Sequence, residues 1–210
     1  AKIDAVVFWY GICTAWFFML RASEYLLLAD KPWSQARVLR GSCLRFKLGN
    51  TDVQPWEADE IVVTILGSKT DQYNQGMTRN HFRTSEELCP VEAAAAYARE
   101  YPQRFFGTEA EEPLLRKADG RAISREEFQH VLKLAAIANG QDPEQMGSHS
   151  LRIGGATAMY LFSKDLEEIK RFGRWTSDAF HGYLHEDHGR MKGVAKQMAT
   201  MRSELMRGKA

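Results

Sequence analysis

The sequence Leu20-Arg21-Ala22-Ser23-Glu24 ends the longest apolar run of the chain, which begins at Ala5. The run is shorter than the ~18 to 20 residues that cross a hydrocarbon core, so it predicts a buried helix inside a globular domain. Arg21 interrupts this apolar region, where a guanidinium without a partner is costly to bury. Glu24 lies one helical turn further on. The pair is therefore either an intrahelical ion pair or a carboxylate that orients Arg21 toward an anion.

The sequence on either side of this segment predicts a mainly helical domain with one small sheet. Segments 37–48, 60–66 and 76–83 show strand patterns and predict a three-stranded antiparallel sheet. Ser124 and Glu127 form a capping-box pattern at the start of one helix. The expected fold class is α+β, mainly α with this small sheet. Helices are expected at 3–19, 23–28, 90–100, 124–138, 151–162, 165–172, 177–185 and 190–206.

Length and composition indicate one folded domain. The 210 residues are 44% hydrophobic and 26% charged, which excludes a disordered, collagen-like or coiled-coil chain. No repeat or long linker divides the sequence, so we expect a single domain over residues 1–210. The chain begins almost directly with its apolar run, as if cut inside a longer protein, and it shows no secretion or organelle signal. Three widely spaced cysteines favour a reducing compartment.

Charge is segregated along the chain although the net charge is only +1. Residues 31–50 carry five basic and no acidic side chains, whereas residues 86–112 carry seven acidic ones. This distribution fits one cationic face opposite an acidic one, or ordinary solvated surface. The net charge alone does not indicate a nucleic-acid partner.

Metal and hydrolase sites are poorly supported. His181 and His185 are one helical turn apart, but the segment lacks the glutamate that zinc proteases place beside their first histidine. Ser148 and His149 are neighbours in sequence, with no acid partner indicated. Gly154-Gly155 lies inside a helical pattern, so close helix packing explains it better than a phosphate loop. We expect no metal.

Three further segments point to an anion. His149 and Arg152 have i, i+3 spacing at an expected helix start, where backbone N–H groups and the helix dipole favour negative charge. Gly173-Arg174-Trp175 is followed by Tyr183, about two helical turns later. Together with Arg21 these residues form a candidate site.

In order and spacing, the segments at 20–24, 149–152 and 173–175, with Tyr183, resemble the catalytic domain of the tyrosine recombinases, the phage-integrase family. The resemblance covers nearly the whole chain. The strings at 67–72 and 171–180 are similar to recombinases of eukaryotic mobile elements, the cryptons and DIRS-like retrotransposons. Trp175 stands where most relatives have histidine. The N-terminal core-binding domain of such enzymes is absent from residues 1–210.

The resemblance implies a site-specific DNA recombinase or integrase that cleaves and rejoins DNA strands through a covalent 3′-phosphotyrosine, with no cofactor. Tyr183 is the implied nucleophile and Lys69 the implied acid for the leaving 5′-oxygen. Arg21 and Arg152 hold the phosphate, and Glu24 orients Arg21. His149 removes the tyrosine proton or bonds the phosphate, and Trp175 donates a hydrogen bond to it. Further candidate contacts to DNA phosphates are Arg40, Arg45, Lys47, Arg171 and Arg174.

The implied partner is double-stranded DNA, bound by a homo-tetramer that exchanges its C-terminal helix. The apolar stripe of residues 190–206 fits that role or packing on its own domain. No membrane partner is expected. The expected location is intracellular: nuclear for a eukaryotic mobile element, cytoplasmic for a prokaryotic one. The alternatives are a catalytically silent DNA-binding module derived from a mobile element, a type IB topoisomerase-like enzyme, and a helical scaffold, which leaves Arg21 unexplained.

Overall fold

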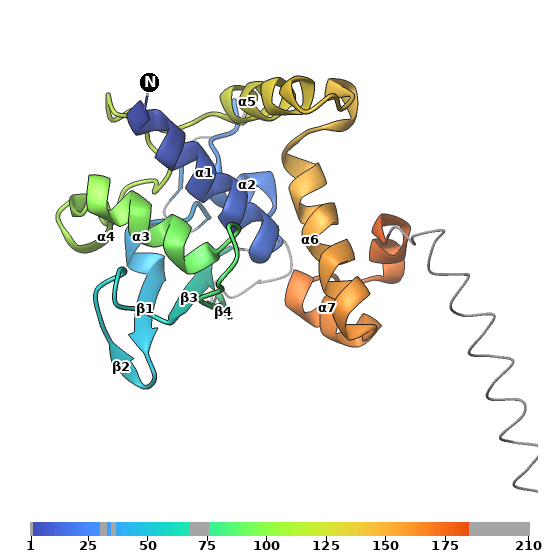
Figure 1. Ribbon diagram of the computed structural model, residues 1–210, viewed down its shortest axis with the longest axis horizontal. Helices are drawn as coiled ribbons and strands as arrows, with labels where there is room; N and C mark the ends of the chain where they lie inside the picture. Colours follow the sequence, from blue (N-terminus) through green and yellow to red (C-terminus); the bar gives the residue numbers. More distant parts are fainter. Residues whose placement is uncertain (1, 30–32, 35–36, 68–75, 185–210) are drawn as a thin grey trace, which may run out of the picture.

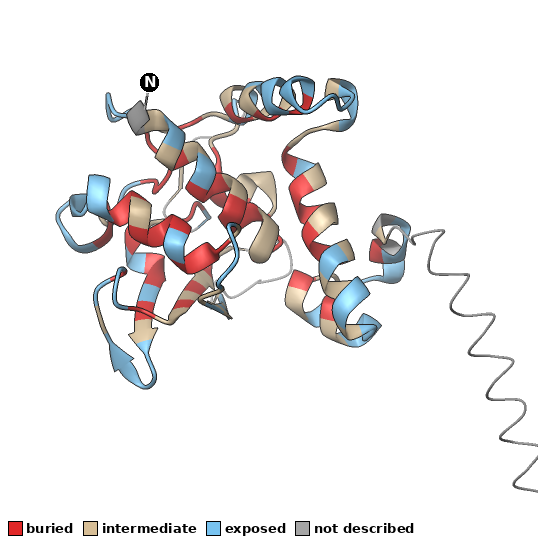
Figure 2. Ribbon diagram, viewed as in Figure 1, coloured by how far each residue is buried: buried red, intermediate tan, exposed pale blue. Residues whose placement is uncertain are grey.

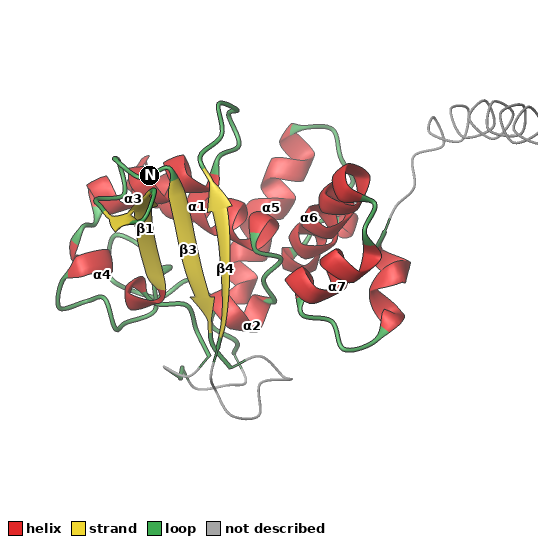
Figure 3. Ribbon diagram, turned by 90° about the horizontal axis from the view of Figure 1, so that it is seen from below, coloured by secondary structure: helices red, strands yellow, loops and turns green. Residues whose placement is uncertain are grey.

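The computed structural model describes residues 2–29, 33–34, 37–67 and 76–184 (Figure 1). Helix α1 (Lys2–Phe17) runs through the middle of the fold, and α3 (Pro90–Glu100) packs beside it. Figure 3 shows a sheet over these two helices, with α6 (Ser148–Ser163) and α7 (Leu166–Gly173) beyond one of its edges. None of the described helices combines the length and apolarity required of a membrane span.

The sheet is antiparallel, as expected, and has one more strand than expected. Strands β1 (Leu44–Leu48), β3 (Glu60–Ile65) and β4 (Met77–Phe82) correspond to the three predicted segments. The expectation of three strands is corrected by β2 (Thr51–Asp52), which pairs with β1 and makes the order β2-β1-β3-β4. Gly49, with φ of +59°, permits the tight turn between β1 and β2.

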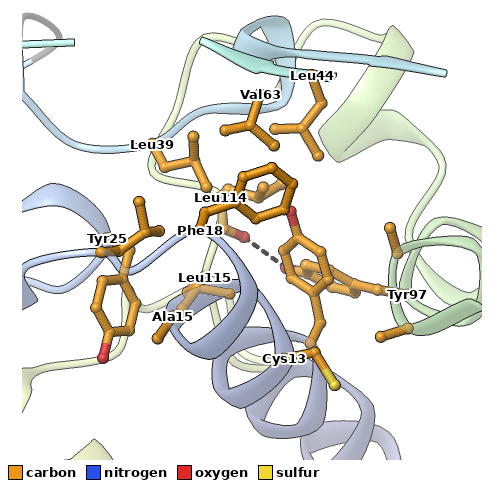
Figure 4. Close-up of a cluster of buried hydrophobic side chains, with 14 of the residues drawn as sticks. Cys13, Ala15, Phe18, Tyr25, Leu39, Leu44, Val63, Tyr97, Leu114 and Leu115 are labelled. Carbon is orange, nitrogen blue, oxygen red and sulfur yellow. Dashed lines mark hydrogen bonds between the residues drawn. The ribbon is translucent and has the colours of Figure 1, made fainter. Parts of the chain in front are cut away.

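The core lies between the sheet, α1 and α3. Ile61, Val63 and Ile65 alternate toward it along β3, as one buried sheet face requires. Figure 2 shows that burial is concentrated on α1, α3 and the inner face of α6. In the close-up of Figure 4 the hydroxyl of Tyr97 donates a 2.5 Å hydrogen bond to the carbonyl of Leu114, which satisfies a polar group inside the cluster.

Several predicted helices differ from the structure at their ends. Helix α5 (Arg125–Ala138) begins after the predicted capping box, in which Glu127 N–H donates to Ser124 Oγ at 3.1 Å. The helix expected at 23–28 is a single turn, α2 (Ala22–Tyr25), because Leu26 is extended and Leu27 then bonds to Ile123. The segment at 177–185 forms a 3-10 helix, η3 (Asp178–Tyr183), and 190–206 lies outside the described residues. The remaining elements are α4 (Gln103–Phe106) and the 3-10 helices η1 (Gly41–Cys43) and η2 (Pro143–Gln145).

Helix α6 approaches the end of α1 closely because of its two glycines. A Cβ atom on Gly155 would lie 2.1 Å from the carbonyl oxygen of Trp16, and one on Gly154 would lie 2.2 Å from the Trp16 ring. The close helix packing expected from this glycine pair is confirmed. It brings the start of α6 to the segment that links α1 and α2.

Candidate active site

The turn between α1 and α2 positions Arg21. Met19 has φ of +49°, a conformation that a side chain with a Cβ rarely adopts and that recurs at functional sites. Arg21 then precedes α2, and its backbone N–H donates to Glu24 Oε2 at 2.7 Å. Its guanidinium donates to Glu24 Oε1 at 3.0 Å, so the predicted ion pair is present.

Glu24 also binds a second guanidinium, that of Arg174. The carboxylate is 4% exposed, and Arg174 Nη2 lies 2.7 Å from Oε2. Arg174 ends α7 with φ of +62°, so its backbone carbonyl turns back and accepts a 3.1 Å bond from Arg21 Nη2. Its own guanidinium donates to the carbonyls of Phe18 and Met19, both at 3.1 Å. Glu24 and Arg174 thus hold Arg21 from two sides.

This environment corrects one expectation. Arg174 was predicted to contact DNA phosphates, but its side chain is fully buried and already bonded to a carboxylate and two carbonyls. Burial lowers the pKa of Arg174, and the nearby charge of Glu24 opposes that shift. Arg174 therefore stabilises the site from inside the protein.

Arg152 is the other buried arginine of the site. It is 2% exposed and donates to the carbonyls of Met19 and Gly173. Its guanidinium lies 4.2 Å from the centre of the Trp175 ring, a cation–π arrangement. Trp175 packs directly over Gly173, where a Cβ would collide with the indole, and stacks on Phe180.

Four of the predicted residues meet at one pocket of about 400 Å³. Arg21, His149, Arg152 and Trp175 come from the start of α2, the first turn of α6 and the segment after α7. No acidic side chain belongs to the described lining. The pocket therefore has an excess of positive charge, which favours an anionic ligand. The rest of the lining is Ala22, Ser23, Leu28, Arg125 and Ser148.

His149 lies on the exposed side of this pocket. Helix α6 begins three residues earlier than predicted, so His149 is inside its first turn. Partial burial, followed by the charges of Arg152 and Arg125, lowers the pKa of His149 below its ordinary value. This shift favours the neutral form of the imidazole, which is the form that accepts a proton.

Sequence reasoning missed Arg125 and Ser148 as pocket residues. Arg125 is recognisable only as the residue after the cap of α5, and a local signal does not connect it with His149. The fold makes the connection, because Arg125 N–H donates to the Leu27 carbonyl at 2.9 Å and so joins the start of α5 to the end of α2.

Of the remaining predicted residues, those whose side chains the structure describes do not line the pocket. Lys69 lies outside the described residues, and Tyr183 ends η3 with a side chain that is likewise outside the description. Arg40 pairs with Glu111, and Arg45 pairs with Asp52 at 3.0 Å. Lys47 and Arg171 do not belong to the lining. Within the described part of the chain, three or more potential metal ligands do not cluster anywhere.

Solved structures of other proteins share the fold of this chain. No family model matches the chain, and no curated protein matches it in sequence. Among solved structures, it is similar to the XerH site-specific recombinase bound to a difH substrate before cleavage, with a TM-score of 0.58 and 16% identity over 93% of this chain and 48% of that one. The post-cleavage complex of XerH with a palindromic difH substrate gives a TM-score of 0.62 and 16% identity over 93% and 46%.

The Tn1549 transposon integrase in complex with circular intermediate DNA is also similar, with a TM-score of 0.47 and 14% identity over 89% of this chain and 56% of that one. The chain spans about half the length of the XerH recombinase. The expected fold, mainly α with a small antiparallel sheet and arranged as in recombinase catalytic domains, is confirmed by the XerH structures.

Proposed function

We propose that this chain is the catalytic domain of a tyrosine-type DNA recombinase or integrase, which cleaves and rejoins DNA strands through a covalent 3′-phosphotyrosine. The observation that carries the proposal is the pocket where Arg21, His149, Arg152 and Trp175 meet, with no acidic side chain in its described lining. A shared fold with site-specific recombinases supports the proposal.

The chemistry of this site suits a phosphodiester. The two non-bridging oxygens carry the negative charge, and two planar guanidiniums bind them better than two lysines because each offers a fork of donors. Arg21 and Arg152 are held by carbonyls and by Glu24 before any ligand arrives. This preorganisation reduces the rearrangement needed as charge shifts in the transition state.

The reaction exchanges one ester for another. The Tyr183 oxygen attacks phosphorus and forms the phosphotyrosine bond, while the bond from phosphorus to the 5′-oxygen breaks. Neutral His149 accepts the phenol proton or bonds the phosphate, and Lys69 protonates the departing oxygen. A free 5′-hydroxyl from another strand reverses the steps. The exchange needs no added energy source, because one phosphodiester replaces another.

The finer parts of the proposal rest on the sequence resemblance. They are an origin close to crypton or DIRS-like elements, a tetramer on DNA with exchange of the C-terminal helix, and action inside the cell, in the nucleus if the host is eukaryotic. Arg45, Lys47 and Arg171 remain proposed phosphate contacts outside the pocket. Arg40 remains a proposed contact as well, although carboxylates partly offset the charges of both Arg40, which pairs with Glu111, and Arg45, which pairs with Asp52.

Covalent trapping tests the activity. The protein is incubated with a pool of nicked duplexes of randomised central sequence, and adducts that survive denaturant are isolated. Tyr183→Phe should abolish the adduct, whereas Tyr160→Phe, on α6 and outside the pocket, should retain it. Salt-sensitive binding without an adduct would favour the silent DNA-binding module. Relaxation of supercoiled DNA without strand exchange would favour a topoisomerase.

A further inference from the structure

Ser148 presents an unexplained polar group in the wall of the pocket. The residue is 1% exposed, and within the described structure its hydroxyl oxygen has no hydrogen-bond partner. A buried hydroxyl without a partner destabilises a fold, and such groups in native proteins usually have a specific reason. Rotation of the Ser148 side chain toward the pocket that it lines would let a ligand oxygen supply the missing bond.

The surroundings of Ser148 favour a negatively charged ligand. Ser148 is the first residue of α6, a helix of 16 residues, so the positive end of the helix dipole lies at this position. Arg125, the first residue of α5, lines the same pocket and is exposed. In the described structure the guanidinium of Arg125 takes part in no ion pair, unlike that of Arg21.

The backbone fixes both helix starts. Arg125 N–H donates to Leu27, immediately after α2, and α6 is pressed against α1 through Gly155. Ser148 and Arg125 are therefore attached to the end of α1 and to the segment after α2, on either side of the turn that positions Arg21. A ligand held by Arg21 and Arg152 has these two residues within the same pocket.

We propose that Ser148, Arg125 and the N-terminus of α6 form a second phosphate subsite, which binds the phosphate next to the reacting one on the same DNA strand. The inference rests on the proposed function, because it takes Arg21 and Arg152 as the binders of the reacting phosphate. A DNA strand carries one charge per ~3.4 Å of helix axis, so a pocket that holds one phosphate always has another nearby.

Short oligonucleotides test the subsite without knowledge of the target sequence. The thymidine dinucleotide d(TpT) carries one phosphodiester and the trinucleotide d(TpTpT) carries two. We expect the wild-type protein to bind d(TpTpT) about tenfold more tightly, as a charge-assisted hydrogen bond allows. Arg125→Gln and Ser148→Ala should each remove most of that gain, so that the ratio of the two dissociation constants falls toward one, as measured by NMR titration.

Arg121→Gln is the matched control, because Arg121 lies outside the pocket and pairs with Asp119 at 2.8 Å. It should keep the full gain. Equal affinities for the two probes, with d(TpT) binding lost in Arg21→Gln, would overturn the subsite and leave the proposed function standing. No binding of either probe would overturn both. A d(TpTpT) gain that survives in both pocket variants would overturn the assignment to these residues.

Discussion

Replacing Glu24 with glutamine should destabilise the protein strongly, because one buried carboxylate serves two arginines. Its side chain is 4% exposed, that of Arg174 is fully buried, and the three bonds to Glu24 oxygens measure 2.7 to 3.0 Å. Breaking a buried ion pair by removing one charge costs about 3–5 kcal/mol. For a chain of this size, 1 kcal/mol corresponds to roughly 2–4 °C in melting temperature. We therefore expect Glu24→Gln to melt roughly 6–20 °C below the wild type.

The assay is thermal unfolding followed by far-UV circular dichroism at pH 7. Glu144→Gln is the control, because its carboxylate is 79% exposed and its 2.8 Å pair with Lys133 is a surface pair of about 1 kcal/mol or less. If the melting temperature of Glu24→Gln falls no further than that of Glu144→Gln, the Glu24 carboxylate does not hold the site together. Arg174→Met provides the other arm of a double-mutant cycle. The double variant with Glu24→Gln should lose less than the two single losses together, since both remove the same pair.

Two further predictions concern packing and pH. Gly155→Ala should lower the free energy of unfolding by about 1–3 kcal/mol in denaturant titrations, because its Cβ meets the Trp16 carbonyl, whereas Gly182→Ala, with open space around it, should change little. His81 contacts the Phe17 carbonyl at 2.7 Å among three aromatic rings, and burial lowers its pKa below the ordinary value of 6.5. The neutral His81 imidazole contributes its full stability above pH 6.5, and this contribution is lost as the pH falls toward the pKa of the folded state. Between pH 7 and pH 5 the melting temperature should therefore fall by less in His81→Gln than in the wild type.

Local patterns predicted much of the fold. Helix α3 has its predicted bounds, since Pro90 and the following apolar period act within a few residues. The capping box of α5 depends only on Ser124 and Glu127. The two-residue strand β2 was missed, because a single turn at Gly49 produces it and no apolar alternation marks it. The 3-10 form of η3 was not predicted; its Phe180 packs in the cluster around Met19, a contact between distant segments that no local pattern marks.

The sequence likewise predicted some residues of the candidate site and missed others. Arg21, His149 and Arg152 were recognisable from short motifs, and the structure brings them to one pocket. The burial of Arg174 was not predictable, because it depends on a left-handed backbone at that residue and on a partner 150 positions away. Arg125 and Ser148 were missed for a related reason: they reach the pocket only through contacts between elements that are distant in sequence.

The part of the domain that contains α6, α7 and η3 is attached to the rest by close packing of α6 on α1 and by a set of polar bonds. Its own apolar cluster is small. Arg152 and Arg174 bond to carbonyls at the end of α1, and Arg79 on β4 bonds to the carbonyls of Phe172 and Arg171 at 3.1 and 2.6 Å. Opening this part would break these polar bonds and separate the two buried arginines from Arg21.

Native-state hydrogen exchange should therefore show faster exchange in α7 than in α1 or α3, whose side chains form the main core. Arg79→Gln removes the link from the sheet to the last carbonyls of α7. It should accelerate exchange in α7 severalfold and leave α1 unchanged, because only the local opening becomes easier. Arg99→Gln, on the exposed side of α3, is the control and should alter neither helix. Equal acceleration of α7 and α1 in Arg79→Gln would mean that α7 opens only with the whole domain, and that the site is as rigid as the core beneath it.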